Sequence, residues 1–489
     1  MPPSLYWYDY ETFGADPVRD RPAQFAGIRT DEDLDPVGEP LVLYCRPAPD
    51  FLPQPAACLV TGITPQLAWE KGVCEDEFIA RINAEFSRPE TCVAGYNNIR
   101  FDDEVTRHTL YRNLYDPYAR EWRGGNSRWD LIDVVRLTYA LRPEGIVWPE
   151  REDGAPSFRL ERLTAANGIA HAEAHDALAD VRATIALARL VRARQPRLYA
   201  YCFDHRRKDA LRRLIDLETL KPLLHVSEKY PARRGCLALV APVGWDPGNP
   251  NGVAVWDLSV DPAMLLELET EQLRRLLYTP SRELAEDETR PALKTVRLNR
   301  CPVLAPPNAL RSQDAERLGI DLAACERHLA WLRRHRRAVE TVLPELLQWP
   351  EAEEAPLDPE LALYRGGFFS ARDRALMAQV HRLDPERLRH FEADFDDPRL
   401  PELLFRFRAR NWPETLSAEE RARWERFRIE RLTCPERGAS IVWEDFWREL
   451  ARLRSEAVQG DAAILEALEE YAREILPVAG RCLLEKTLS

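Results

Sequence analysis

The sequence predicts three domains, in the order α/β, small β-barrel and all-helical. Three observations predict this order. Strand patterns, followed by strands that alternate with helices, occupy residues 1–195 and are typical of an α/β sheet domain. Short β-type runs punctuated by Gly and Pro fall within 196–350, and apolar residues at helical spacing fill 357–489. The length of 489 residues agrees with about three domains of roughly 150 residues each.

The α/β domain begins with an alternating segment at residues 4–13. Leu5, Trp7, Asp9 and Glu11 share one side of it, and three tyrosines share the other. This period of two predicts a strand. Further strands are predicted at 24–30, 41–46 and 91–97, and helices at 103–113, 129–140, 158–166 and 176–194. The order indicates an α/β sheet domain that ends near residue 195.

The middle domain is predicted from short strands at 236–240, 253–258 and 294–298. A helical insertion near 272–286 and a helical arm at 314–347 complete it. The segment WPEAEEAPLDPE is acidic and rich in Pro, which predicts a linker. Beyond it, the apolar residues of 443–450 and 464–475 keep the three-to-four spacing of buried helix faces.

Composition and charge favour some classes of protein over others. The chain has 68 basic and 81 acidic residues, a net charge of −13, which argues against a polyanionic partner for the chain as a whole. Residues 201–350 are an exception, with a small basic excess, so a phosphate-binding face is expected there. The longest apolar stretch, near 236–245, is too short to span a membrane. The acidic N-terminus does not resemble a signal peptide, and the ten Cys form no CxxC pair, so we expect reduced thiols in a cytoplasmic protein.

The first candidate site is the pair Asp9 and Glu11. On a strand, residues two apart face the same way, so both carboxylates project from one face about 7 Å apart. Two desolvated carboxylates repel each other, and a bound divalent cation relieves that repulsion. The alternative is a strand end whose acids meet solvent.

Two further candidates lie at the starts of predicted helices. Asp102 and Asp103 follow the strand at 91–97, and we expect Asp102 to point toward a site at the sheet edge and Asp103 to cap the helix. His175, Asp176 and Asp180 open the last helix of the domain, with Asp176 or Glu173 as the candidate cap and Asp180 one turn inside. Taken singly, the Asp residues have the alternative of ordinary helix caps, and a lone His before a helix is most often an ordinary surface or capping residue.

Taken together, the acids form an ordered series that resembles the DEDDh exonucleases, whose fold is ribonuclease H-like. The matching residues are Asp9, Glu11, Asp102 and Asp180, with His175 as the fifth; the related DEDDy branch has Tyr where this chain has Asp176. Longer blocks resemble the bacterial exodeoxyribonuclease I family, among them DYETFGADPVRDRPAQFAGIRTD, GYNNIRFDDEVTRHTLYRNLYDPY, NRCPVLAP, LYRGGFFS and FRFRARNWPETL. The resemblance covers nearly the whole chain.

The resemblance implies a ribonuclease H-like exonuclease domain, an SH3-like barrel and a helical C-terminal domain. It also implies processive 3′→5′ hydrolysis of single-stranded DNA to 5′-mononucleotides in DNA repair and recombination. The four acids would bind two Mg²⁺ ions, for which Mn²⁺ can substitute, and His175 would act as the base.

Substrate and partner residues are likewise implied by the resemblance. Glu11 and Arg159 would bind the substrate end, and the expected DNA contacts are Arg107, Tyr118, Trp122, Arg136, Arg142, Phe158 and Lys208. The acidic tail of single-stranded DNA-binding protein would dock on Arg142, Tyr201 and Arg311 of a monomeric enzyme. For each aromatic residue the alternative is ordinary core, and for each Arg it is a solvated helix face.

Two rival functions remain. The chain could be an RNA-directed DEDDh exonuclease, although such relatives usually have one domain. It could also be a catalytically inactive DNA clamp, although all five residues of the series are present.

Overall fold

The computed structural model describes residues 2–171, 176–285, 288–348, 357–456 and 460–476. The chain forms two compact units. Unit 1 combines residues 1–126, 172–182 and 354–489, and unit 2 combines 127–171 and 183–353. The segment expected to form one domain, 1–195, therefore contributes to both units, and the boundaries at 195, 350 and 357 stay predictions.

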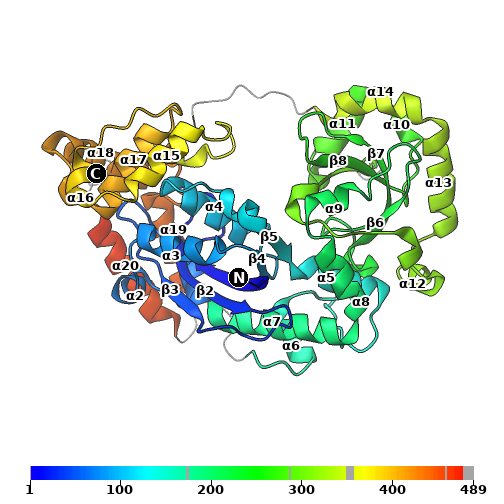
Figure 1. Ribbon diagram of the computed structural model, residues 1–489, viewed down its shortest axis with the longest axis horizontal. Coiled ribbons are helices and arrows are strands. Elements are labelled where there is room, and N and C mark those ends of the chain that lie inside the picture. Colours follow the sequence, from blue (N-terminus) through cyan, green and yellow to red (C-terminus); the bar gives the residue numbers. More distant parts are fainter. Residues whose placement is uncertain (1, 172–175, 286–287, 349–356, 457–459, 477–489) are drawn as a thin grey trace. The chain divides into compact units, whose positions relative to one another are not determined.

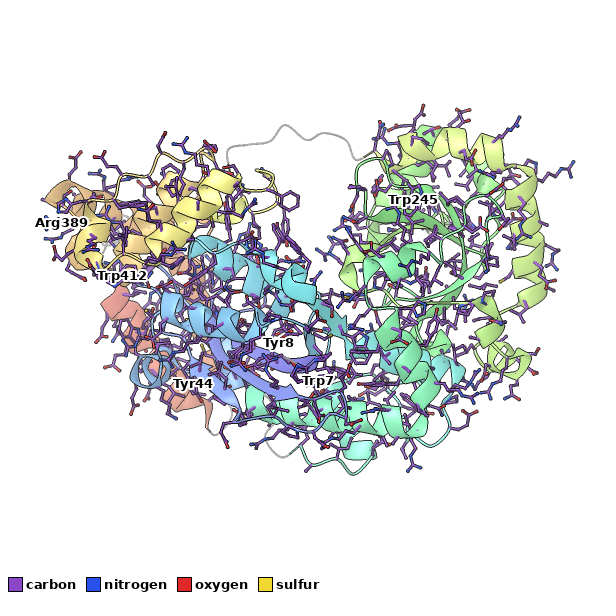
Figure 2. All side chains as sticks on the ribbon, in the orientation of Figure 1. Trp7, Tyr8, Tyr44, Trp245, Arg389 and Trp412 are labelled. Atoms are coloured by element: carbon purple, nitrogen blue, oxygen red, sulfur yellow. The ribbon has the colours of Figure 1, made fainter. Side chains whose placement is uncertain are left out.

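Unit 1 contains a sheet in which β1 (Ser4–Thr12) is central. It pairs antiparallel with β2 (Pro22–Thr30) and parallel with β4 (Thr91–Gly95), and β2 pairs with the short β3 (Leu41–Tyr44). The predicted alternation of β1 is confirmed: the three tyrosines pack into one core against α3 (Glu75–Phe86) and α4 (Asp102–Arg112). Figure 2 labels Trp7 and Tyr8, adjacent residues of β1 and therefore on opposite faces.

The C-terminal helices share cores with the N-terminal part of unit 1. Phe13, Phe51 and α1 (Pro55–Thr61) pack with Leu465 and Leu468 of α20 (Asp461–Ile475). Figure 1 shows α20 beside α2 (Pro65–Lys71), although the two are far apart in sequence. The other helices of this region are α15 (Ala371–Val380), α16 (Pro385–Arg389), α17 (Leu400–Asn411), α18 (Ala418–Thr433) and α19 (Trp443–Glu456). The predicted helical C-terminus is confirmed.

Unit 2 is built on a five-stranded antiparallel sheet in the order β10-β6-β7-β8-β9. Its strands are β6 (Leu223–Val226), β7 (Leu237–Trp245), β8 (Gly252–Asp257), β9 (Leu293–Arg297) and β10 (Leu304–Ala305). The insertion between β8 and β9 forms α10 (Met264–Glu267) and α11 (Thr270–Tyr278), which pack with α14 (Arg336–Leu347) (Figure 1). The predicted arm is three helices, namely α12 (Ser312–Arg317), α13 (Leu322–Arg334) and α14.

Before the barrel, unit 2 contains β5 (Ser127–Asp130), α5 (Leu131–Leu141), α6 (Leu160–Ala166), α8 (Pro196–Asp204) and α9 (Lys208–Arg212). Helix α7 (Ala177–Arg194) starts in unit 1 and continues into unit 2. The helix predicted at 129–140 begins later, because Asp130 ends a short strand and its side chain caps α5 by accepting from the Ile132 N–H. None of the helices in the described parts of the chain combines the length and apolar composition that crossing a bilayer requires.

Candidate metal centre

Three of the predicted acids come together in unit 1. Asp9 and Glu11 project from β1 and Asp180 from the first turn of α7, and one carboxylate oxygen of each lies within 4.8 Å of the other two. Glu11 is buried, and Asp9 and Asp180 are partly buried. The structure therefore places the two β1 acids on one face. Asp180, which is 169 positions further along the chain than Glu11, lies beside them.

Asp102 lies near this group without belonging to the close cluster. It is the first residue of α4, is buried, and accepts a hydrogen bond from the Tyr10 N–H at 3.2 Å. That bond ties the start of α4 to the strand residue between Asp9 and Glu11. Burial raises the pKa of Asp9 most, and the charge of Asp102 raises it further.

Asp103 is not the helix cap that the sequence predicts. The residue at the cap position is Phe101, and Asp103 lies inside the first turn of α4, fully buried. Its Oδ1 accepts from the Tyr8 hydroxyl at 3.0 Å and from Arg120 Nη2 at 2.7 Å. The expectation fails because α4 begins at Asp102, one residue earlier than predicted, so that Asp103 lies inside the helix and its buried carboxylate pairs with Arg120.

The electrostatics of the cluster favour a cation. Burial, and then the charges of Asp102, Asp180 and Asp176, raise the pKa of Asp9. Burial, and then Asp9, Asp180 and Asp176, raise the pKa of Glu11 to about 9. Carboxylates that repel one another in a desolvated site are relieved by a divalent cation. The donors are all carboxylate oxygens, the ligands that hard cations such as Mg²⁺ prefer.

The start of α7 is organised by Asp176. Its Oδ2 accepts from the Ala179 N–H at 3.2 Å, as expected of a cap, and its backbone carbonyl accepts from the Asp180 N–H at 3.0 Å. Its Oδ1 accepts from the side chain of Gln24 at 3.1 Å. Gln24 was not found from the sequence, because a Gln in a strand has no local pattern that marks it. His175 lies outside the described residues.

The residues expected to contact DNA differ in how exposed their side chains are. Arg159, at the start of α6, and Lys208, at the start of α9, are exposed. Trp122 is 64% exposed. Tyr118 is partly buried, with its ring edge-on to Phe368 at 5.4 Å.

Three of the other expected contacts, Arg107, Arg136 and Phe158, are held within the fold, and Arg142 is described below with the predicted partner residues. Arg107 is buried and donates to Glu121 at 2.7 and 2.9 Å and to Glu104 at 2.9 Å. Arg136 is buried, pairs with Asp133 at 2.6 Å and lies over the ring of Phe158. Phe158 is itself buried in an aromatic cluster with Tyr139 and Trp148, which matches the core alternative.

Two of the predicted partner residues are neighbours in unit 2. Arg142 donates to the Ala309 carbonyl at 3.1 Å, and Arg311 donates to the Leu141 carbonyl at 3.0 Å. Arg311 also pairs with Asp314 and Glu144. Tyr201 donates to the Leu304 carbonyl at 3.0 Å.

Comparisons with known proteins agree with this arrangement. Residues 6–188 match the family model described as Exonuclease, residues 206–348 match the Exonuclease I SH3-like domain, and residues 357–475 match the Exonuclease I C-terminal domain.

Among curated proteins, the chain is 50% identical to exodeoxyribonuclease I of Escherichia coli (strain K12) over 97% of this chain and 98% of that protein. It is 46% identical to exodeoxyribonuclease I of Haemophilus influenzae over 97% of this chain and 99% of that protein.

Two solved structures are similar over the same length. The moderately thermophilic Exonuclease I from Methylocaldum szegediense superimposes with a TM-score of 0.93 at 57% identity, covering 97% of this chain and all of that one. Exonuclease I of E. coli in complex with a dA16 oligonucleotide superimposes with a TM-score of 0.92 at 49% identity, again covering 97% of this chain and 100% of that one.

Proposed function

The chain belongs to the exodeoxyribonuclease I family, and from that premise we propose that it hydrolyses single-stranded DNA processively from the 3′ end. The products are 5′-mononucleotides, and the enzyme acts as a monomer in DNA repair and recombination in the bacterial cytoplasm. The observation that carries this proposal is the cluster of Asp9, Glu11 and Asp180, carboxylates from two elements that each bring one oxygen within 4.8 Å of the other two.

Asp9, Glu11, Asp102 and Asp180 would hold two Mg²⁺ ions, with Mn²⁺ as a substitute. Two divalent cations supply a nucleophilic water at neutral pH and stabilise the attacking and leaving oxygens of an in-line displacement. Asp9, with the other acids around it, would contribute to the binding of both ions. Glu11 would also touch the terminal 3′-hydroxyl, and Arg159, which is exposed, would bind the substrate end.

His175 is proposed as the general base that takes the proton of the attacking water. Its replacement by Ala is expected to lower turnover by about 10²–10⁴-fold, because a positioned base contributes that much to proton transfer. The acidic limb of the pH–rate profile should disappear or move in the variant. A profile measured at saturating Mg²⁺ decides this, and an unchanged limb with normal turnover would remove His175 from the mechanism.

The DNA path would first use the residues that are exposed or partly buried. Tyr118 and Trp122 would stack bases, and Lys208 would follow the phosphates. Arg107, Arg136 and Phe158 stay predictions, since each would have to exchange an internal contact for DNA. Arg142, Tyr201 and Arg311 are proposed to bind the acidic tail of single-stranded DNA-binding protein, which fluorescence anisotropy with a labelled tail peptide and Arg311→Ala can test.

The polarity of digestion tests the proposed function directly. A single-stranded DNA oligonucleotide labelled at its 5′ end should shorten stepwise in Mg²⁺, with no shortening when a chelator is added. A blunt duplex should resist, because the sequence contains no GxxxxGK[ST] motif for unwinding. A matched RNA oligonucleotide serves as the comparison. Immediate release of the 5′ label as a mononucleotide, or equal digestion of the RNA, would contradict the proposal.

A further inference from the structure

Gln24 occupies an unusual place in the sheet of unit 1. It is the partner of Glu11 in the antiparallel register of β1 and β2, and it is only 2% exposed. A buried amide costs free energy unless its polar atoms are hydrogen-bonded. At this position an apolar side chain would be the cheaper choice for stability alone.

The amide of Gln24 is bonded through both of its ends. Its Nε2 donates to Asp176 Oδ1 at 3.1 Å and to the Tyr44 hydroxyl at 2.9 Å, and its Oε1 accepts from the Ala177 N–H at 3.2 Å. Tyr44 lies on the edge strand β3 (Figure 2). Two of the three bonds therefore cross from β2 to the beginning of α7.

Those two bonds act on groups that the helix itself cannot satisfy. The first N–H groups of an α-helix have no acceptor within the helix, and Gln24 supplies one to Ala177. The carboxylate of Asp176 is shared between Gln24 and the Ala179 N–H. Asp180 lies one helical turn after Asp176, and its own N–H donates to the Asp176 carbonyl. The amide of Gln24 thus bonds to both residues that precede and open the turn carrying Asp180.

We propose that Gln24 is a positioning residue for the metal centre, which holds the first turn of α7 against β2 so that Asp180 meets Asp9 and Glu11. Because Gln24 is paired with Glu11 in the strand register, one side chain sets the spacing between the two elements that supply the carboxylates. The expected effect of Gln24 on Mg²⁺ response and turnover rests on the proposed function, whereas its expected effect on the order of the first turn of α7 does not. Groups that orient metal ligands typically change metal affinity or activity about 10–100-fold when they are removed.

The test compares Gln24→Leu with two matched controls. Tyr44→Phe removes only the bond that does not reach α7. Gln66→Leu removes a different amide in unit 1, whose Nε2 donates to the Ala467 carbonyl. Hydrogen exchange of the peptide containing Ala177–Asp180 is measured in chelator, and Mg²⁺ titrations give kcat, KM for DNA and the half-saturating Mg²⁺ concentration.

For Gln24→Leu we expect faster exchange confined to the start of α7. We also expect a half-saturating Mg²⁺ concentration raised, or kcat lowered, about 10–100-fold, while KM for DNA stays within about twofold. Both controls should keep the wild-type exchange at this turn and the wild-type Mg²⁺ response. A Gln24→Leu protein that is only less stable, with unchanged exchange at 177–180 and unchanged Mg²⁺ dependence, would overturn the inference. An inactive wild-type enzyme would instead refute the proposed function, and the exchange measurement would still decide the role of Gln24.

Discussion

Replacing Asp180 by Asn is expected to reduce hydrolysis of single-stranded DNA by about 10³-fold or more while the protein remains folded. The substitution removes one of the three carboxylates that converge in the metal centre. Cation stabilisation of the reacting oxygens is worth several kcal/mol, and each 1.36 kcal/mol corresponds to a factor of ten in rate. Product formation from a labelled oligonucleotide at saturating Mg²⁺ measures the loss, and near-normal turnover would contradict the metal assignment.

The same variant carries a prediction for stability. The pKa of Glu11 is raised to about 9 from 4.5, first by burial and then by Asp9 and Asp180. A carboxyl group whose pKa is higher in the folded protein than in the unfolded chain contributes stability at pH values below its unfolded pKa. This contribution is lost as the pH rises from about 4.5 toward 9. Without one of the repelling charges, Asp180→Asn in chelator should therefore melt at or above the wild-type temperature at pH 8, with a smaller difference at pH 5.

Thermal melting in chelator checks this, with Asp445→Asn as the control. Asp445 is an exposed aspartate on α19, and among the described residues its ion pair is with Arg448, one turn further along the same helix. Its replacement should leave both the melting temperature and the turnover close to wild type. A large drop in the melting temperature of Asp180→Asn at pH 8 would show that Asp180 is needed for the fold, so that the loss of activity could not be assigned to the metal centre.

Glu360→Gln is expected to destabilise unit 1 by about 3–5 kcal/mol, the usual result of removing one partner from a buried ion pair. Glu360 is 4% exposed, and its carboxylate pairs with Arg21 at 3.0 Å, Arg431 at 3.1 Å and Arg410 at 2.5 Å. Arg410 also forms a two-bond pair with Asp50. The variant would leave buried guanidinium groups short of negative charge at the junction of the N-terminal and C-terminal segments.

Urea unfolding followed by circular dichroism measures this change at neutral pH. Burial opposes ionisation of Glu360, but Arg410, Arg431 and Arg21 outweigh it and hold its pKa well below the usual range. A carboxyl group whose pKa is lower in the folded protein than in the unfolded chain contributes stability at pH values above its unfolded pKa of about 4.5. This contribution is lost as the pH falls toward the folded pKa. The gap between wild type and Glu360→Gln should therefore narrow in acid. A loss below about 1 kcal/mol, equal to that of the exposed pair at Asp445, would contradict a structural role for this network.

The family and the order of the acids could be predicted from the sequence because both depend on local patterns. The period of two in residues 4–13 places Asp9 and Glu11 on one face of β1, and the structure confirms that placement. The acidic residues at the starts of α4 and α7 follow the same logic, since helix starts favour acidic residues. The helical character of the C-terminal region was likewise evident from its apolar spacing.

Contacts between distant segments have no such period, and they are what the tertiary structure decided. Asp103 pairs with Arg120 instead of capping α4, Gln24 joins β2 to α7, and Phe51 packs with Leu465. The helices of the C-terminal segment share a core with the N-terminal part of unit 1, and Glu360 forms a buried ion pair with Arg21, just before β2. The alternation of side chains and the capping of helices depend on the backbone of a few consecutive residues. The partner of a buried charge or amide instead depends on which segments of the chain pack around it and exclude water.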